Sequence, residues 1–232
     1  MIDGKSVLAI IPARGGSKGL SRKNLRLLKG RPLLAWTIAA AQASGLIDRL
    51  ILTSEDEEIR MLARRLGCEV PFDRPADLAG DEASMPSTIM HAISSLPQQY
   101  DLVVLLQPTS PLRVAEDIDG CIQLCVNHGA HSAISVAAVE QHPYWMFSLG
   151  TDARLTPYEV KRPTSTRRQD LPALHIPNGA VYVVDRLWFE RHHKFISEGT
   201  VGYEMPMERS IDIDSENDLH MAELLVEYST AS

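Results

Sequence analysis

The sequence predicts a three-layer α/β fold built on a mostly parallel, doubly wound sheet. Two observations support this prediction. The apolar runs at residues 7–11 and 102–106 suit strands that are buried on both faces of a parallel sheet. These runs alternate with segments of helical pattern, and the N-terminal part follows the order strand, helix, strand, helix, strand. That order favours right-handed crossovers and a parallel sheet.

Further elements are expected along the chain after the first strand. Arg31 and Pro32 open a helix that Gly45 ends. Ser54 is expected to cap the next helix, since Asp56, Glu57 and Glu58 suit a helix N-terminus. The other expected strands are 49–53, 68–70, 101–106, 132–139 and 178–184, and the other expected helices are 87–96, 115–127, one from 187 and one after Ser215.

Two stretches break this alternation. Residues 72–84 have no periodicity and form a long loop, a kind of segment that often carries function. Residues 140–177 are first aromatic and then polar and basic. Because about 35 irregular residues inside a compact domain are unusual, we expect an arm that packs on another subunit.

Composition limits the class of protein. The chain has 232 residues, of which 44% are hydrophobic, enough for a single domain over residues 1–232 with a substantial core. A net charge of −7 argues against general nucleic-acid binding, which usually needs a strongly basic face. No stretch approaches the ~18 apolar residues of a membrane span, so no membrane partner is expected.

The start of the chain and the cysteines indicate where the protein acts. The first residues lack the charged and apolar regions of a signal peptide. The three cysteines lack the spacing of a metal site, and Cys121 and Cys125 share one face of a helix. We expect reduced thiols packed in the core, and a cytoplasmic location.

A basic, glycine-rich loop follows the first strand. Between Pro12 and Asn24 the chain has three glycines and four cations. Glycines allow tight turns and close approach to a ligand, and free backbone N–H groups form an anion-binding nest. The loop has the glycine spacing of neither a P-loop nor a dinucleotide fingerprint. It is either an ordinary basic surface turn or, as we predict, a cradle for a nucleoside triphosphate.

Two carboxylates near the C-terminus form a candidate metal site. Asp212 and Asp214 stand two apart in a strand-like segment, which puts both on one face. Mg²⁺ is commonly held by one or two carboxylates together with substrate phosphates. The alternative is a solvated pair beside the next helix, and the triphosphate cradle favours the metal site, with Mg²⁺ or Mn²⁺ as the cofactor.

The segment from Gln107 to Arg113 forms a polar rim at the end of a predicted strand. Two prolines flank Thr109 and Ser110, and open α/β sheets bind ligands at this edge. Gln107 could bind a substrate hydroxyl or amide group, or it could stabilise the proline-rich turn. The sequence does not decide between these roles.

The motif running from Leu8 to Gly19, with Arg22-Lys23-Asn24 after it, resembles the signature of the sialic acid cytidylyltransferases, which activate nine-carbon sugar acids. The likeness extends over nearly the whole chain. It includes 74–79, 105–113, 168–172, 177–182 and 212–214. The resemblance implies a Rossmann-like nucleotidyltransferase fold, CTP and a nine-carbon sugar acid as ligands, and a homodimer formed through the arm at 140–177.

The resemblance also implies a set of site residues. Positions implied to bind the nucleotide are Ala13, Arg14, Gly15, Ser17, Lys18, Lys23, Asn24, Arg74, Ala83 and Ser84. Positions implied to bind the sugar are Gln107, Ser110, Arg168, Asn178, Gly179 and Tyr182. The catalytic set is Arg14, Lys18, Lys23 and Asp212, with the metal on Asp212 and Asp214.

Two departures from the better-known sialic acid enzymes bear on the sugar. Trp145 and Ile176 stand where those enzymes carry cations. Arg168, Lys161 or Arg162 would then hold the sugar carboxylate. We expect a less polar substrate, a 5,7-diacylamino acid of the legionaminic or pseudaminic type. The alternatives are N-acetylneuraminate, the eight-carbon acid KDO, a relative that uses GTP, and a nucleotide-binding regulatory module without catalysis.

Overall fold

A six-stranded sheet forms the centre of the computed structural model, which describes residues 1–17, 19–80, 82–158 and 167–231. The strand order is β10-β6-β9-β5-β1-β4. β9 runs antiparallel to its neighbours β5 and β6, and the other neighbouring pairs are parallel. The mostly parallel sheet predicted from the sequence is confirmed. The strands are β1 (Val7–Pro12), β4 (Arg49–Thr53), β5 (Leu102–Leu106), β6 (Ser132–Ala138), β9 (His175–Asp185) and β10 (Val201–Glu204).

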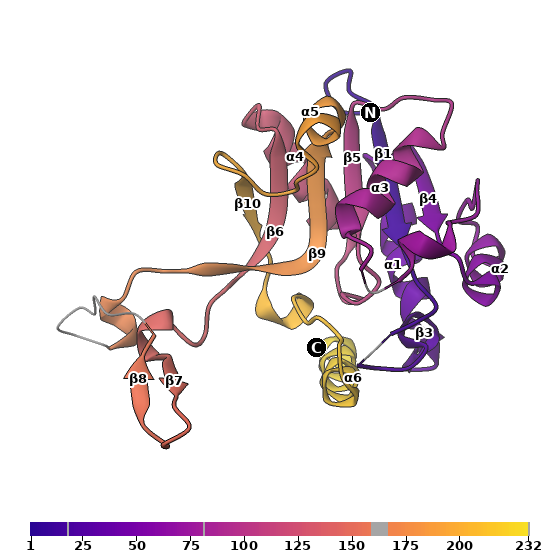
Figure 1. The fold of residues 1–232 in the computed structure, drawn as a ribbon. Helices are drawn as coiled ribbons and strands as arrows, with labels where there is room; N and C mark the ends of the chain where they lie inside the picture. The colour runs from indigo at the N-terminus through magenta and orange to yellow at the C-terminus, as the bar shows by residue number, and fades with distance from the viewer. Residues whose placement is uncertain (18, 81, 159–166, 232) are drawn as a thin grey trace.

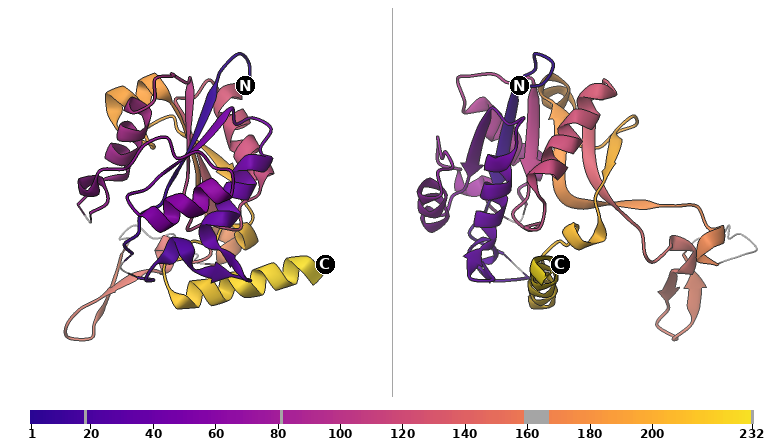
Figure 2. Two further views of the ribbon diagram at one scale, coloured as in Figure 1. Left: turned by 90° about the vertical axis from the view of Figure 1, so that its right-hand side faces the viewer. Right: turned by 180° about the vertical axis from the view of Figure 1, so that it is seen from behind.

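Helices cover both faces of this sheet, which gives three layers (Figure 2). Residues of α1, α2 and α4 pack in the core on one face, and residues of α3 and α5 pack on the other. The helices are α1 (Leu33–Ala43), α2 (Glu57–Arg65), α3 (Met85–Ser94), α4 (Ala115–Asn127), α5 (Arg186–His192) and α6 (Glu216–Ala231).

The first strand explains why the sheet is covered on both sides. Alternate side chains of a strand point to opposite faces. Val7, Ala9 and Ile11 enter the core on one face, and Leu8 and Ile10 enter the core on the other. A continuous apolar run is therefore what this strand requires.

The order in which successive strands are added to the sheet reverses at β1. β4 follows β1 on one side, whereas β5 lies on the other side of β1. The loops that leave β1 and β5 therefore diverge at the carboxyl ends of these strands, and such a switch point is where open α/β sheets bind ligands. The last helix, α6, packs below this edge through Leu219 and Ala222 (Figure 1).

Several boundaries differ from the sequence predictions. α2 is capped by Asp56, whose side chain accepts the Ile59 N–H, so the predicted cap at Ser54 is wrong. The predicted strand at 68–70 is a single bridge between Ile51 and Glu69. Two features were not predicted from the sequence, namely β10 and the short hairpin of β2 (Leu27–Leu28) and β3 (Arg31–Pro32).

The arm at 140–177 projects away from the rest of the molecule (Figure 1). Its described part is not wholly irregular, because β7 (Phe147–Leu149) and β8 (Leu155–Pro157) form an antiparallel hairpin. β9 begins at His175 rather than at Asn178 and carries the chain back from the arm into the sheet. The arm is thus an excursion between β6 and β9.

The prediction that the cysteines pack in the core is borne out in the part of the chain that the structure describes. Cys68, Cys121 and Cys125 are free and buried. Burial raises the pKa of the Cys68 thiol to about 12, so this thiol stays protonated at neutral pH. None of the described helices has the length and apolar character needed to cross a bilayer.

Candidate active site

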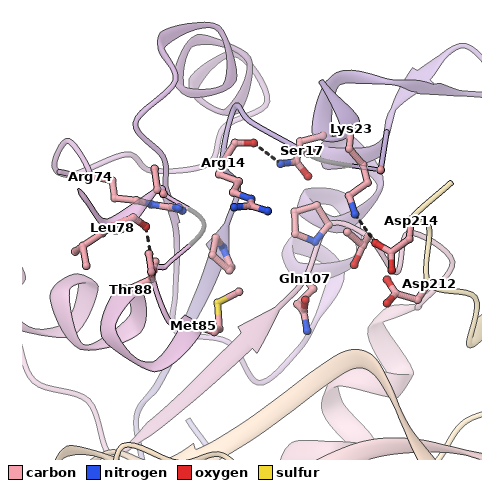
Figure 3. A pocket seen from close by; sticks show the side chains of 18 residues that line it. Arg14, Ser17, Lys23, Arg74, Leu78, Met85, Thr88, Gln107, Asp212 and Asp214 are labelled. Carbon is pink, nitrogen blue, oxygen red and sulfur yellow. Dashed lines mark hydrogen bonds and ion pairs between the residues drawn. The ribbon is translucent and has the colours of Figure 1, made fainter. Parts of the chain in front are cut away.

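A cavity of about 500 Å³ lies at the carboxyl ends of β1 and β5. Three cations face it, namely Arg14 and Lys23 from the glycine-rich loop and Arg74 from the long loop at 72–84 (Figure 3). We call it the basic cavity. Its other polar and charged walls come from Ser17, Asn24, Thr88, Gln107, Thr109, Asp212 and Asp214.

The glycine-rich loop is held in place by close backbone contacts. The side-chain amide of Asn24 donates to the Arg14 carbonyl at 2.8 Å, which closes the loop on itself. A Cβ atom at Gly15 would lie 2.5 Å from Oδ2 of Asp56, and one at Gly19 would collide with the Asp214 carbonyl. Only glycine fits at these two positions, so both glycines allow neighbouring segments to approach.

Arg74 comes from the long loop at 72–84 and is buried. Its guanidinium donates to the hydroxyl and the carbonyl of Thr53 at the end of β4. Burial lowers its pKa, an effect that the Glu55 carboxylate 3.8 Å away opposes. The same carboxylate accepts the Gly15 N–H at 2.7 Å, so Glu55 connects Arg74 with the glycine loop.

Two carboxylates stand beside the loop. The ammonium of Lys23 lies 2.7 Å from Oδ1 of Asp214, and Asp212 faces the same cavity (Figure 3). Ile213 between them is fully buried, which turns both carboxylates to the cavity side. The surrounding protein raises the pKa of Asp212 first by desolvation, and the Asp214 charge adds to this effect.

This pair fits a divalent cation that is shared with phosphate oxygens. Among the described residues, no group of three or more His, Cys, Asp and Glu side chains gathers as an all-protein cage. Mg²⁺ often needs no such cage, since one or two carboxylates with substrate phosphates suffice. The Lys23 ammonium at Asp214 is a positive charge already held at this position. Asp212 and Asp214 are therefore the residues that could hold the metal.

A second cavity of about 520 Å³ opens between β6, β9 and the short helix at Met207–Arg209. Its walls include Val139, Met146, Ile176 and Met207, so we call it the apolar cavity. The remaining lining residues are Gln107, Ala137, Ala138, Glu140, Gln141, Pro177, Asn178, Gly179, Tyr182, Ser210 and Asp212.

The two cavities meet at Gln107 and Asp212, which line both. Gly179 packs against this junction with φ +78°, a backbone conformation that favours glycine. A Cβ atom there would lie 3.8 Å from Oδ2 of Asp212 and 3.8 Å from Nε2 of Gln107. Gln107 and Asp212 are therefore within reach of groups bound in either cavity.

The chain matches the model of the family described as "Cytidylyltransferase" over residues 8–159. This chain belongs to the cytidylyltransferase family. The match covers the loop, Arg74, the rim at Gln107 and part of the arm. The family predicted from the sequence is confirmed.

Curated relatives within the family act on different sugar acids by name. The chain is 33% identical to "CMP-N,N'-diacetyllegionaminic acid synthase" of Legionella pneumophila, with 95% of this chain and 96% of that protein covered. It is 32% identical to "Pseudaminic acid cytidylyltransferase" of Campylobacter jejuni, with 94% and 95% covered. It is 33% identical to "N-acylneuraminate cytidylyltransferase" of Streptococcus agalactiae over 91% of this chain, but spans only 51% of that protein.

Solved structures support the cytidylyltransferase fold. A CMP:2-keto-3-deoxy-manno-octonic acid synthetase determined in complex with CTP superimposes with a TM-score of 0.73. The superposition covers 97% of this chain and 99% of that one, at 14% sequence identity. At this identity the likeness shows the fold alone, and it confirms the nucleotidyltransferase architecture.

Most of the predicted site residues line the two cavities. Those that line the basic cavity are Arg14, Ser17, Lys23, Asn24, Arg74, Ala83, Asp212 and Asp214. Those that line the apolar cavity are Gln107, Asn178, Gly179 and Tyr182. Ala13 and Ser110 are buried behind the walls, Gly15 turns its N–H to Glu55, and Ser84 caps α3. Lys18, Lys161 and Arg162 lie outside the described residues.

Asn178 and Arg168 differ from Gln107, Gly179 and Tyr182, the other predicted sugar-binding residues that line the apolar cavity. The Asn178 amide is engaged inside the protein, because it donates to Ser210 Oγ and accepts from Ser135 Oγ and the Ala180 N–H. Arg168 is exposed on the arm and is absent from the lining of both cavities of its own chain.

Several wall residues of the two cavities were not predicted from the sequence. Met85 and Thr88 reach the basic cavity from the first turn of α3, and Met207 and Ser210 reach the apolar cavity from the short helix before Asp212. They carry no motif of their own. The signal in the sequence that could have pointed to them was their position shortly before or after segments already predicted to belong to the site. Of the two departures noted in the sequence, Ile176 lines the apolar cavity, whereas Trp145 is not among its lining residues.

Proposed function

We propose that this cytidylyltransferase transfers the cytidylyl group of CTP to the anomeric hydroxyl of a nine-carbon sugar acid, releasing pyrophosphate. The observation that carries the proposal is the meeting of a basic cavity and an apolar cavity at Gln107 and Asp212. A triphosphate suits the cations of the first cavity. A sugar with apolar substituents suits the second.

The basic cavity has the groups that a leaving pyrophosphate needs. In the proposed reaction, the hydroxyl oxygen forms a bond to the α-phosphorus, the bond from that phosphorus to the bridging oxygen breaks, and the hydroxyl proton goes to water. Arg14 and Lys23 stabilise the charge that develops on the β- and γ-phosphates, and Lys18 of the same loop is assigned to this group. Arg74, at the other side of the cavity, is assigned to the cytosine base.

Asp212 and Asp214 are proposed to hold Mg²⁺ or Mn²⁺. When bound, the ion neutralises phosphate charge and makes the attacking hydroxyl more acidic. The position of Asp212 at the junction suits this role, because it reaches the lining of both cavities. Most of the acceleration then comes from positioning and from electrostatics, since little covalent chemistry is asked of the protein.

The preferred substrate is proposed to be a 5,7-diacylamino acid of the legionaminic type. Val139, Met146 and Ile176 line the apolar cavity, and acylamino and methyl groups bury better against such walls than hydroxyl groups do. The names of the Legionella and Campylobacter relatives agree with this class. The free, buried cysteines agree with a cytoplasmic location, where thiols stay reduced.

The test is a grid of pyrophosphate-release assays with Mg²⁺. CTP, GTP, ATP and UTP are each paired with legionaminic acid, pseudaminic acid, N-acetylneuraminate and KDO. Release with CTP and a diacylamino acid is the expected result. Fastest turnover of N-acetylneuraminate or KDO would reject the sugar assignment, and a preference for GTP would reject the base. Silence across the grid would favour a regulatory module that only binds nucleotide.

We also propose a homodimer formed through the arm. The hairpin exposes apolar side chains, with Leu149 70%, Leu155 61% and Tyr158 69% exposed. An isolated two-stranded hairpin is at best marginally stable in water, so a partner surface would explain its apolar face. Arg168 on the arm is absent from its own chain's cavity walls, and in a dimer it would serve the partner subunit's sugar.

Complementation tests this arrangement. Arg168→Ala and Asp212→Ala variants are each expected to be weakly active alone. Mixed dimers would contain one intact site, which restores about a quarter of wild-type activity under random pairing. No restoration in mixtures that sedimentation shows to be dimeric would contradict a role of Arg168 in the partner's site. Sedimentation as a monomer would reject the dimer itself.

A further inference from the structure

Arg113 is among the largest fully buried side chains of the described protein. It stands at the end of the rim, before α4. Its Nε donates to the Ala180 carbonyl at 2.9 Å, and its Nη1 donates to Thr37 Oγ1 at 2.9 Å. Its Nη2 donates to the Gln107 carbonyl. One guanidinium thus connects β9, α1 and the rim.

This burial is costly. Among the described residues, no carboxylate forms an ion pair with Arg113, and burial lowers its pKa from the ordinary value, while Asp117 and Asp212 act in the opposite direction. A buried charge without a paired counter-ion is unfavourable unless hydrogen bonds compensate for it. An apolar side chain of similar volume would fill the space at lower cost. The presence of a guanidinium at this position is therefore explained by the three groups to which it donates hydrogen bonds.

Two of its acceptors belong to the wall between the cavities. Gln107 lines both cavities, and Ala180 directly follows Gly179, beside which the side chains of Gln107 and Asp212 lie. By binding the two carbonyls, Arg113 fixes the distance between the rim and β9. That distance sets where the two cavities open into each other.

A second arginine connects the same helix to the next wall segment. Arg209 binds the buried carboxylate of Asp117 in a bidentate pair, at 2.9 Å and 2.7 Å. Asp117 lies in the first turn of α4 and also accepts the Val114 N–H. Arg209 belongs to the short helix that supplies Met207 and leads into Asp212. The start of α4 thus anchors three segments of the apolar cavity.

Resting on the proposed function, we propose that Arg113 is a positioning residue of the transfer reaction, whose guanidinium holds the wall between the two cavities so that the sugar hydroxyl meets the α-phosphate. It touches neither substrate. Its effect passes through the backbone of Gln107 and Ala180. Arg209 supports the same wall from the other side.

Arg113→Lys keeps the charge but cannot make all three hydrogen bonds. Steady-state kinetics should show kcat reduced by about 10–100-fold and a raised KM for the sugar, because a shift near 1 Å can cost 10²-fold. The dissociation constant for CTP, measured by calorimetry without sugar, should change by less than about threefold, since the loop and Arg74 are untouched. A structural role alone would weaken CTP binding and turnover together.

Arg209→Lys is the second variant, and it tests the proposal if Arg113→Lys does not fold. Its side chain is partly exposed, so we expect a smaller fall in kcat, about 3–10-fold, again with CTP affinity retained. Arg186→Lys is the matched control. Arg186 also binds a backbone carbonyl, that of Tyr100, but at the opposite edge of the sheet. Its melting temperature should fall while its kinetics stay at the wild-type values.

The outcomes separate the two proposals. If the wild type is active, a folded Arg113→Lys variant with normal kcat and normal KM for the sugar would overturn the positioning role of Arg113 and leave the proposed function standing. If Arg113→Lys does not fold, normal values in Arg209→Lys would have the same meaning. Parallel loss of CTP affinity and kcat would also overturn the positioning role. A folded wild type that is silent across the substrate grid would reject the proposed function, and the positioning role would be rejected with it.

Discussion

The basic cavity and the apolar cavity share a wall, but the chain builds them differently. The basic cavity takes Arg14, Ser17, Lys23 and Asn24 from one short stretch, which is fixed by its own hydrogen bonds and by glycines at close contacts. The apolar cavity collects single residues from β6, the arm, β9 and the segment before α6. Its polar wall residues, such as Asn178, are partly engaged in holding these segments together.

Under the proposed function, this difference corresponds to a division of labour between the binding of a triphosphate and the binding of a sugar acid. A triphosphate presents much charge in a small volume, so adjacent cations and backbone N–H groups in one loop can bind it. A sugar acid with several substituents needs contacts at separate points, and these come from distant parts of the chain. The first cavity is expected to be sensitive to loss of charge, and the second to changes of shape and polarity.

The largest effect is expected where the two cavities meet. Asp212→Asn should reduce kcat by about 10³-fold, because it removes one of the two carboxylates assigned to the metal. Folding should not suffer, since desolvation by the surrounding protein raises the pKa of Asp212 and disfavours its ionised form in the folded state. Pyrophosphate release and thermal unfolding at neutral pH measure the two quantities.

The sign of the stability effect follows from linkage. A carboxyl group with a raised pKa in the folded state makes the free energy of unfolding fall as pH rises through that pKa. The neutral amide should therefore match or exceed the wild type in melting temperature. A near-normal kcat at saturating Mg²⁺ would contradict the metal assignment. A large fall in melting temperature would mean that Asp212 stabilises the fold.

A smaller loss is expected in the basic cavity. Lys23→Met removes one cation and should lower kcat/KM for CTP by about 10²-fold, the cost typical of one lost charge-stabilising donor. The KM for the sugar should stay within about threefold, because Lys23 does not line the apolar cavity. Steady-state kinetics with each substrate varied in turn separates these effects.

Lys29→Met is the control for this variant. Lys29 pairs with Glu227 on the surface and lines neither cavity, so the same substitution there should leave both kinetic parameters unchanged. Equal losses in the two variants would point to a general effect of charge. A sugar KM that rises with Lys23→Met would contradict the separation of the cavities.

The basic cavity was largely predictable from the sequence, for a physical reason. A loop that is proposed to bind phosphate needs glycines and cations at short spacing, so its signal lies within one continuous segment at 13–24. The burial of strands β1 and β5 was equally local, because each is a continuous apolar run. The role of Glu55, which accepts the Gly15 N–H, depends on a contact between separate loops and had no local signal.

The apolar cavity was predictable only in part. Gln107 and Tyr182 were recognised because they stand in motifs, whereas Met207 and Val139 were not. Their place in the wall follows from how β6, β9 and the short helix before Asp212 pack, which no periodicity encodes. β10 was missed for a similar reason, since its pairing with β6 brings together residues far apart in the chain.

A shift in selectivity is expected in the apolar cavity. Ile176→Arg introduces a cation where the better-known sialic acid enzymes carry one. The ratio of kcat/KM for N-acetylneuraminate to that for a diacylamino acid should rise about tenfold, within the range of 10–200-fold that one pocket group usually gives. CTP parameters should stay unchanged, since Ile176 does not line the basic cavity.

Leu187→Arg is the matched control for this variant. Leu187 is exposed on α5 and lines neither cavity, so it tests the effect of an added surface arginine. Competition assays with both sugars in one reaction give the ratio directly. An unchanged ratio for Ile176→Arg would mean that this wall does not contact the substituents that distinguish the two sugars.

The smallest effect of a substitution is expected at Asp101, which lies at the opposite edge of the sheet and serves as a reference for the comparison of the two cavities. Its Oδ2 accepts the backbone N–H of Ser6 at 2.8 Å and the Ser6 hydroxyl at 2.8 Å, and these bonds lower its pKa. The ionised carboxylate therefore stabilises the folded state above the ordinary pKa of aspartate, and this contribution is lost as pH falls through the lowered value.

Because Asp101 is exposed, Asp101→Asn should cost only about 0.5–1 kcal/mol at neutral pH, and the difference from wild type should shrink in acid. Urea unfolding at several pH values measures this, and both sets of kinetic parameters should be unaffected. A change in either KM would mean that a small loss of stability far from the cavities alters substrate binding. The kinetic effects of the variants in the two cavities would then have to be corrected for their loss of stability before they are compared.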